Sequence, residues 1–200
     1  MSTSQPTAAN PPAAPRRGCF SLLKTIFFVL LVVLLTVIVI VLLQPDEFRI
    51  ERSVVMNAPA SAPFTQVNDF HNWEKWSPWA KLDPAMKVTY EGPASGVGAI
   101  YSWAGNSEVG EGRMEILESK PNELIRIKLD FIKPFPSTCD TVFAFRPDGS
   151  NTFVSWTMTS KKNFIAKTFH LFVNMDKMLG GDFDKGLASM KSVVEGKAKE

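Results

Sequence analysis

The segment NFIAKTFHLFVNMDKMLGGDFDKGLASMKSVV (163–194) changes the hydrophobic period of the chain from two residues to between three and four. Apolar residues at this spacing predict one continuous apolar stripe on a long C-terminal helix. Gly180-Gly181 interrupts the stripe, which predicts either a kink or the close approach of another element. The stripe comprises Ile165, Phe169, Phe172, Met175, Leu179, Phe183, Leu187, Met190 and Val194. A helix with one apolar face must bury it, so the preceding residues have to supply a partner.

The partner is a series of strands. Segments with strand signals recur between residues 86 and 161, separated by Gly, Pro, Asn and Asp. In ELIRIKLDF (123–131) the apolar residues fall on one face and the charged residues on the other. RPDGSN (146–151) predicts a turn between the last two strands. The six segments are MKVTYEG, GAIYSWAGN, VGEGRMEILESK, ELIRIKLDFIK, TCDTVFAFRPDG and NTFVSWTMTSK.

An earlier strand and a short helical region complete the domain. FRIERSVVMN (48–57) has strand alternation, and Phe64, Val67 and Phe70 then recur at helical spacing. The order of elements predicts an α+β fold. In it, a curved antiparallel sheet of about seven strands wraps around the long C-terminal helix.

A hydrophobic run, TIFFVLLVVLLTVIVIVLL (25–43), precedes this domain. Its nineteen residues carry no charge, and as a helix they would extend roughly 28 Å, close to the hydrocarbon thickness of a bilayer. A signal peptide has a shorter apolar region and a small-residue cleavage site, and a core helix would have a polar face. The run therefore predicts one transmembrane helix over residues 19–44.

The remaining chain divides into a tail and a domain. Residues 1–18 are rich in Pro and Ala without apolar periodicity, which predicts a disordered tail. Residues 46–200 are near the commonest size of a single domain.

Charges on either side of the hydrophobic run predict its orientation. Arg16, Arg17 and Lys24 precede the run, whereas Arg49 and Arg52 follow it. By the positive-inside rule the N-terminus would be cytoplasmic and the C-terminal domain extracytoplasmic, which in a bacterium means periplasmic.

The charge balance and the cysteines exclude several classes of protein. The chain has 22 Lys and Arg and 20 Asp and Glu; without Arg16, Arg17 and Lys24 the domain keeps 22 − 3 = 19 basic residues against 20 acidic ones. This balance, with charges interspersed, predicts no nucleic-acid partner. Cys19 and Cys139 would be separated by the bilayer, so we expect no disulfide bond within the chain.

From Phe48 to Val194 the chain resembles the START-related superfamily, also called SRPBCC or polyketide cyclase/dehydrase-like, which has the helix-grip fold. The resemblance is carried by VNDFHNWEKWSPWAKLDP (67–84), GVGAIYSWAGN (96–106), GEGRMEI (110–116) and MDKMLGGDFDKGLASMK (175–191). These stretches look like a membrane-anchored branch of small bacterial members. The resemblance implies that residues 46–200 form a helix-grip domain. It also implies a cavity between sheet and helix for lipids, sterols, polyketides or other apolar molecules. No fixed catalytic set follows, because members range from carriers to cyclases.

Trp73, Trp76 and Trp79 form a cluster of aromatic residues. They could be a packed lid over the sheet, the mouth of a cavity or a membrane-interface patch.

Aromatic and Met residues on the strands should face the long helix. Such residues can form an ordinary core or a deformable cavity, and the family resemblance favours the cavity. The candidate ligand-cavity residues are Trp76, Trp79, Tyr101, Trp103, Met114, Phe131, Phe143, Trp156, Phe172, Met175 and Leu179.

No catalytic residue, metal site or cofactor is predicted. His71 and His170, the only histidines, have no neighbours at metal-ligand spacing. One strand could place a carboxylate in the cavity for acid–base chemistry, but a solvated strand face is the simpler interpretation. The residues concerned are Glu108, Glu111, Arg113 and Glu115.

The sequence therefore favours a single-pass membrane protein whose domain binds an apolar small molecule or lipid and presents or shuttles it at the membrane. Its expected partners are the lipid bilayer and that ligand, with no metal. Two alternatives stay open. One is a cyclase- or dehydratase-type enzyme, which requires a carboxylate or His in the cavity. The other is a protein-interaction module without a cavity and with exposed tryptophans.

Overall fold

A computed structural model describes residues 18–196, with the side chains of residues 18–21 and of His170 left out. The predicted tail, residues 1–18, lies outside the described residues except for Gly18. The chain divides into two compact units, residues 1–43 and 44–200, and each unit is described by itself.

The first unit contains one helix, α1 (Gly18–Leu43). Leu22–Leu43 is long and apolar enough to cross a membrane, and its length and composition also fit a signal sequence. Thr36 Oγ1 donates a hydrogen bond to the backbone carbonyl of Val32 over 2.8 Å. The helix thus satisfies this polar side chain internally, as apolar surroundings require.

The second unit is built on a seven-stranded antiparallel sheet with the order β1-β7-β6-β5-β4-β3-β2. Every predicted strand is present. The strands are β1 (Glu47–Met56), β2 (Lys87–Glu91), β3 (Ile100–Ala104), β4 (Glu111–Lys120), β5 (Leu124–Lys133), β6 (Ser137–Asp148) and β7 (Asn151–Lys161). Three helical segments join β1 to β2, namely α2 (Ser61–Asn68), η1 (Phe70–Lys75) and η2 (Pro78–Lys81).

The predicted turn at 146–151 is confirmed. Asp148 pairs with Asn151 at the end of the β6–β7 hairpin. Gly149 within the turn has φ +60°, a left-handed conformation that glycine adopts at little cost.

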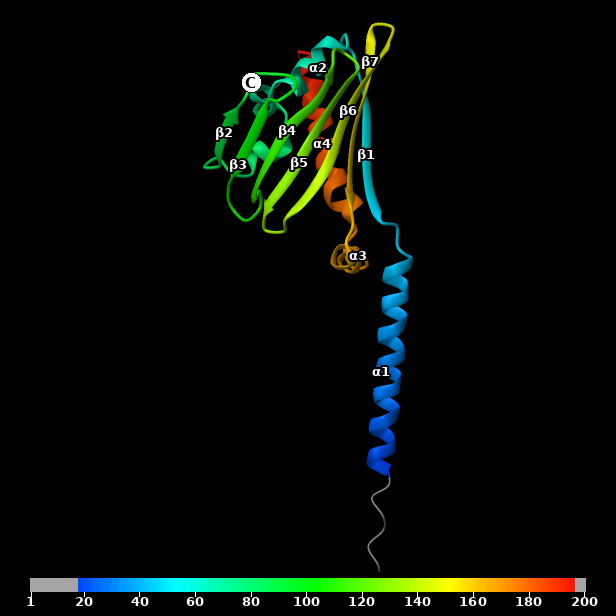
Figure 1. The fold of residues 1–200 in the computed structure, drawn as a ribbon. Coiled ribbons are helices and arrows are strands. Elements are labelled where there is room, and N and C mark those ends of the chain that lie inside the picture. Colours follow the sequence, from blue (N-terminus) through cyan, green and yellow to red (C-terminus); the bar gives the residue numbers. More distant parts are fainter. Residues whose placement is uncertain (1–17, 197–200) are drawn as a thin grey trace, which may run out of the picture. The chain divides into compact units, whose positions relative to one another are not determined.

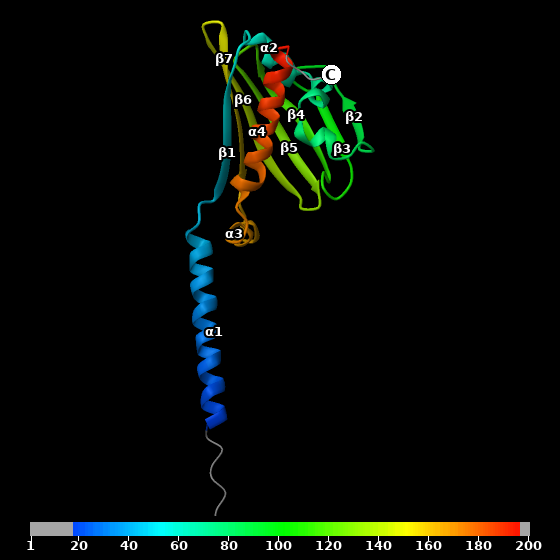
Figure 2. The same cartoon turned by 180° about the vertical axis from the view of Figure 1, so that it is seen from behind.

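The C-terminal helix α4 (Met175–Val194) lies across the concave face of the sheet, as the view from behind also shows (Figures 1 and 2). Alternation along the strands directs apolar side chains to this face, and β6 is representative, with Cys139, Phe143 and Phe145 buried. Phe183, Leu187 and Met190 of α4 meet them in one hydrophobic core. The predicted α+β helix-grip fold is therefore confirmed.

The prediction of one continuous C-terminal helix was wrong in its first third. A separate helix, α3 (Phe164–His170), precedes α4, and residues 171–174 connect the two. The Asn174 side chain accepts a hydrogen bond from the backbone N–H of Lys177 over 3.1 Å and so begins a new helix. The early members of the apolar stripe are consequently exposed: Ile165 by 78%, Phe169 by 50% and Phe172 by 81%.

Gly180 lets another element approach the helix closely, which is one of the two roles that the sequence predicts for Gly180-Gly181; the other was a kink. Helix α4 continues through Gly180-Gly181, and a Cβ atom at Gly180 would lie 2.0 Å from Nη2 of Arg52. The glycine thus lets a β1 side chain pass against the helix backbone.

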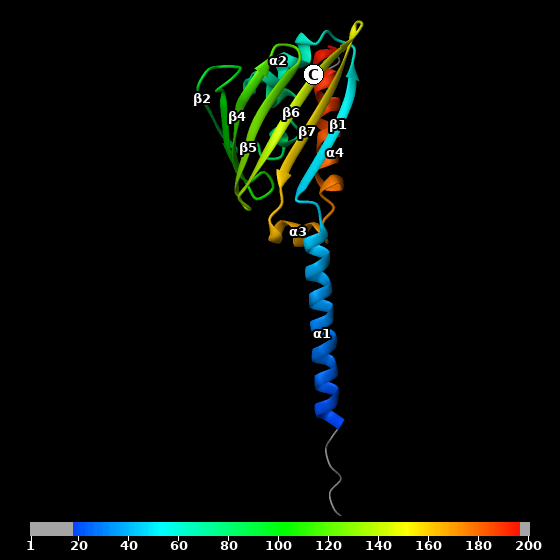
Figure 3. The ribbon, with the colours of Figure 1, turned by 45° about the vertical axis from the view of Figure 1, so that its right-hand side comes forward.

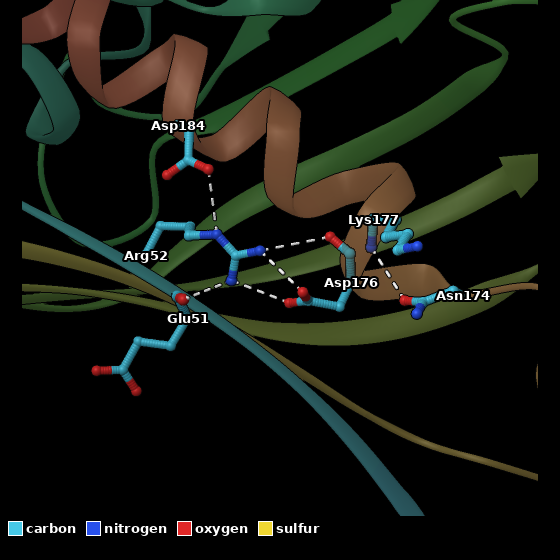
Figure 4. A network of polar contacts seen from close by, with 6 residues as sticks. All are labelled: Glu51, Arg52, Asn174, Asp176, Lys177 and Asp184. Carbon is cyan, nitrogen blue, oxygen red and sulfur yellow. Dashed lines mark hydrogen bonds and ion pairs between the residues drawn. The ribbon is translucent and has the colours of Figure 1, made fainter.

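Arg52 uses this space to pair with two carboxylates of α4, as Figure 4 shows. Its Nη1 lies 2.9 Å from Oδ1 of Asp176, and its Nε lies 3.2 Å from Oδ2 of Asp184. The guanidinium, chiefly through its hydrogen bond, holds the pKa of Asp176 below its usual range. Two carboxylates two turns apart on α4 are thereby tied to one β1 residue.

We expect Gly186→Ala to destabilise the domain. An added Cβ would lie 2.9 Å from Cζ3 of Trp156 and 3.2 Å from Cδ of Pro78. Overpacking of this kind costs about 1–3 kcal/mol, against a gain of up to about 1 kcal/mol in helix propensity. Denaturant unfolding followed by tryptophan fluorescence measures the difference.

Gly181→Ala is the matched control, because a Cβ there meets no atom of the described residues within 4 Å. This variant should keep or raise the free energy of unfolding. Equal effects of the two substitutions would contradict close packing at Gly186.

Candidate ligand site

Aromatic side chains fill the space between α4 and the middle of β6 and β7. The Trp156 ring stacks on Phe183 of α4, with centroids 4.0 Å apart and an angle of 7° between the planes. It also contacts Phe143, Trp76 and Trp79, with centroids 4.9, 5.8 and 5.9 Å away. Trp156 is therefore the centre of a packed cluster in this part of the domain.

Burial decreases along β5 and along α4 toward the end of the domain where α4 begins. Phe143 and Ile125, which pair between β6 and β5, are fully buried. Farther along β5, Leu129 and Phe131 are only partly buried although they share the same face. Met175 and Leu179, in the first half of α4, are also partly buried. We call this part of the face the open end; it is apolar and accessible to solvent.

A groove of about 530 Å³ lies at the open end, between the start of β1 and the connection from α3 to α4. Its volume falls within the range of small-molecule sites. Its apolar lining residues are Phe48, Ile50, Leu171, Phe172, Val173 and Met175, and its polar ones are Gln44, Arg49, Lys162, Asn174 and Asp176. This combination fits a molecule with an apolar body and a polar group.

Two buried polar atoms on the concave face lack a hydrogen-bond partner among the described residues, Oγ1 of Thr141 and Nε1 of Trp156. Thr141 pairs with Met158 and Phe143 pairs with Trp156, so Thr141 and Trp156 are diagonal neighbours on the sheet. Buried polar groups usually find partners, and each unpaired one costs about 1–3 kcal/mol. The pair could accommodate a hydroxyl or carbonyl group of a ligand.

The predicted cavity residues fall into three places. Trp76, Phe143 and Trp156 are buried in the aromatic cluster, with Trp79 partly buried beside them. The remaining residues lie on the concave face or around the groove: Tyr101, Trp103, Met114 and Phe131 on β3–β5, Leu179 on α4, and Phe172 and Met175 in the groove lining. Their contact with a ligand stays a prediction.

Several groove residues were not among the predicted site residues. Phe48 and Ile50 alternate visibly along the first strand, but Leu171 and Val173 were assigned to a continuous helix. The signal that could have found them is Asn174, a residue type that favours the start of a helix, which stands inside the apolar repeat.

Trp73 and Trp76 pack as a lid over the core rather than as exposed rings. Both are buried. Their indole Nε1 atoms each donate over 3.1 Å to backbone carbonyls of the preceding helix, Trp73 to Val67 and Trp76 to Gln66. These bonds satisfy the polar edge of each ring, which is what allows its burial.

The candidate acid–base residues face away from the concave surface. Glu111 and Glu115 alternate with the buried residues of β4, and they pair with Lys133 over 2.8 Å and Arg113 over 3.0 Å. Glu108 is exposed in the loop before β4. The strand carboxylates therefore form a solvated, ion-paired face.

His71 does not face the site either. Nδ1 of His71 lies 2.7 Å from Oδ1 of Asp69, and the exposed ring stacks on Tyr90 with centroids 4.0 Å apart. His170 belongs to α3, and its side chain lies outside the described residues. Within residues 18–196, no group of three or more His, Cys, Asp or Glu side chains could hold a metal ion.

Tyr101 is a titratable group that does face the concave side. Burial, with a smaller electrostatic contribution from Tyr90, raises its pKa to about 12. Burial likewise raises the pKa of the Cys139 thiol. Both groups are neutral at physiological pH, so each can contribute a hydrogen bond but no charge.

Comparison with known proteins places these features in a family. A family model described as "Polyketide cyclase / dehydrase and lipid transport" matches residues 47–195. No curated protein sequence matches the chain significantly.

Solved structures share the fold at low sequence identity. The KanY protein has a TM-score of 0.57 at 16% identity, with 76% of this chain and 100% of that chain covered. The Aha1 dimer from Colwellia psychrerythraea has a TM-score of 0.56 at 14% identity, covering 76% and 99%. A protein from Chromobacterium violaceum has a TM-score of 0.52 at 17% identity, also covering 76% and 99%. At these identities the likeness concerns the fold alone.

We expect the burial of Tyr101 to make folding depend on pH in the alkaline range. The pKa of Tyr101 in the folded state, about 12, lies above its ordinary value of 10.0. Its contribution to stability is therefore fully present below pH 10.0 and is lost as the pH rises through about 12. The chain has two tyrosines, so in the Tyr90→Phe variant the absorbance of tyrosinate reports the ionisation of Tyr101 alone. Ionisation of Tyr101 near its ordinary pKa in the folded variant would contradict its burial.

Proposed function

The chain belongs to the polyketide cyclase / dehydrase and lipid transport family, and we propose that its 44–200 unit binds an apolar small molecule or lipid. The observation that carries this proposal is the decrease in burial along β5 and α4, which leaves an apolar open end next to a groove of about 530 Å³. A face that served only as core would be covered along its whole length.

The chemistry of the open end supports an amphipathic ligand. Burial of a ligand's apolar surface contributes about 25 cal/mol per Å², which has to exceed the loss of translational and rotational freedom. Polar groups then orient the ligand. Thr141, which lies on β6 between Phe143 and Cys139, would bind a hydroxyl or carbonyl group. Arg49 and Lys162 lie in the groove lining, where an acidic group could be bound.

The Gly18–Leu43 helix would anchor this binding domain in a membrane. By the positive-inside rule the domain would be extracytoplasmic, and in a bacterium periplasmic. Anchoring raises the local concentration of the domain relative to lipid-dissolved ligands, as a linker does for two tethered modules. The domain would then present its ligand at the membrane or shuttle it locally.

The two alternatives have less support. A cyclase- or dehydratase-type enzyme would need an acid or base at the site, whereas the candidate strand carboxylates Glu111 and Glu115 lie on the opposite face. An interaction module displaying its tryptophans is disfavoured because Trp76 is only 1% exposed. Binding without catalysis is therefore the function that we propose.

Leu129→Trp should block the open end, because its larger ring would occupy space beside Phe131 and Cys139. We expect the affinity of the 44–200 unit for the fluorescent fatty acid cis-parinaric acid to fall roughly tenfold, equivalent to about 1.4 kcal/mol. Fluorescence titration measures the affinity, and near-ultraviolet circular dichroism checks that the unit is folded.

Leu117→Trp is the matched control, since Leu117 is an exposed β4 residue, and its affinity should stay within about twofold of the original. Lipid mass spectrometry of the purified unit identifies a copurified ligand. Equal affinities of the two variants would refute the site, and the absence of both probe binding and a copurified apolar molecule would refute the function.

Thr141→Val separates a ligand-binding hydroxyl from a structural one. Removal of a buried hydroxyl without a partner should raise the free energy of unfolding of the ligand-free unit by about 1 kcal/mol. It should simultaneously weaken the binding of the copurified ligand. Higher stability with unchanged affinity would show that Thr141 does not contact the ligand.

A further inference from the structure

Helix α3 and the connection after it carry large apolar side chains that are exposed. Phe164 and Phe169 are each 50% exposed, Ile165 is 78% exposed and Phe172 is 81% exposed. We call these four residues the apolar end surface. Large apolar residues gathered in this way on a domain usually mark an interaction site.

The turn between β5 and β6 lies at the same end of the domain as α3 (Figures 1 and 3). Phe135 in this turn is 78% exposed. The turn is linked to the start of α3 through the end of β7, since Ser160 Oγ donates to the carbonyl of Thr138 over 2.7 Å. Phe135 and the apolar end surface therefore belong to one end of the 44–200 unit.

A hydrogen bond and an ion pair fix α3 and the segment just before it to the residues that follow α1. The backbone N–H of Lys162 donates to the carbonyl of Asp46 over 2.7 Å. Nζ of Lys167, a largely buried lysine, lies 2.5 Å from Oδ1 of Asp46. This contact with Lys167 holds the pKa of Asp46 below its usual range.

Covalent geometry then limits how far this end can lie from the end of α1. Asp46 follows Leu43 by three residues, which reach at most about 11 Å when fully extended. If α1 crosses a bilayer, Asp46 and the first turn of α3 must lie close to the membrane surface. An exposed apolar surface at that position has the bilayer as its nearest apolar partner.

The charges around α3 suit the same partner. Residues 161–175 contain no Asp or Glu. Lys161 and Lys162 are their lysines that could meet anionic lipid, since Lys167 is buried and paired with Asp46. Apolar residues flanked by lysines are the composition of segments that bind in the interface of membranes with anionic lipids.

We propose that the apolar end surface binds the surface of the bilayer, with Ile165 and Phe172 inserted at the level of the headgroups. This inference rests on the anchoring part of the proposed function. Because Leu171, Phe172 and Val173 also line the groove, the groove opens beside the inserted residues. An amphipathic molecule could pass between the bilayer and the groove with little exposure to water.

The test uses the full chain in vesicles of phosphatidylcholine and phosphatidylglycerol. Single cysteines replace Ile165 or Phe172 in a Cys19→Ser, Cys139→Ala background and carry an environment-sensitive fluorophore. Matched controls replace Leu117 or Val55, which are exposed on strands away from α3. Lipids with a spin label near the headgroup should quench the fluorophores at 165 and 172 at least threefold more than those at the controls.

Vesicle flotation after alkaline extraction tests the anchor separately. Release of the chain would refute both the anchor and this inference. A retained chain whose fluorophores at 165 and 172 are quenched no more than the controls would refute this inference alone. The fluorophores at 165 and 172 could instead be protected from iodide, a quencher in the water, without being quenched by the labelled lipid. In that case a protein or a second copy of the chain covers the surface, and the proposal is also overturned.

Discussion

The stacking of Phe183 on Trp156 is the contact on which the arrangement of helix and sheet depends. The ring centroids approach to 4.0 Å, which requires the α4 backbone to lie close to the sheet. Gly186 permits this approach, because any side chain there would meet Trp156. Trp76 and Trp79 then close around the same indole. One tryptophan thus brings together β6, β7, α4 and the helical segments after α2.

The first half of α4 is held differently, and this difference produces the site. Arg52 binds Asp176 and Asp184 at the edge of the sheet, so ion pairs add to the partly buried packing of Met175 and Leu179 in this part of the helix. Leu129 and Phe131 on the other strands are therefore left partly uncovered. Close packing at one end stabilises the fold, while the polar attachment at the other end keeps an apolar surface available for a ligand.

Much of the fold could be predicted because its signals are local. Alternation in ELIRIKLDF, the turn residues of RPDGSN and the apolar repeat from Met175 onward each define an element without reference to any other. The continuous helix over 163–194 was wrong because the same repeat runs through Phe169 and Phe172, and only the Asn174 cap separates the two helices. Likewise, the groove joins the start of β1 to residues 171–176, a contact between segments more than one hundred residues apart.

The sequence by itself determined the apolar N-terminal helix, the strands and the α+β class, because hydrophobic period, length and turn chemistry are properties of neighbouring residues. The family came from a resemblance of the chain between Phe48 and Val194. Only the tertiary structure decided which apolar residues are buried. Trp76 and Phe143 lie in the core, and Phe172 lies at the surface, although all three look alike in the sequence. The physical reason is that burial depends on what the fold places opposite a side chain, and for these residues the opposing elements are distant in the chain.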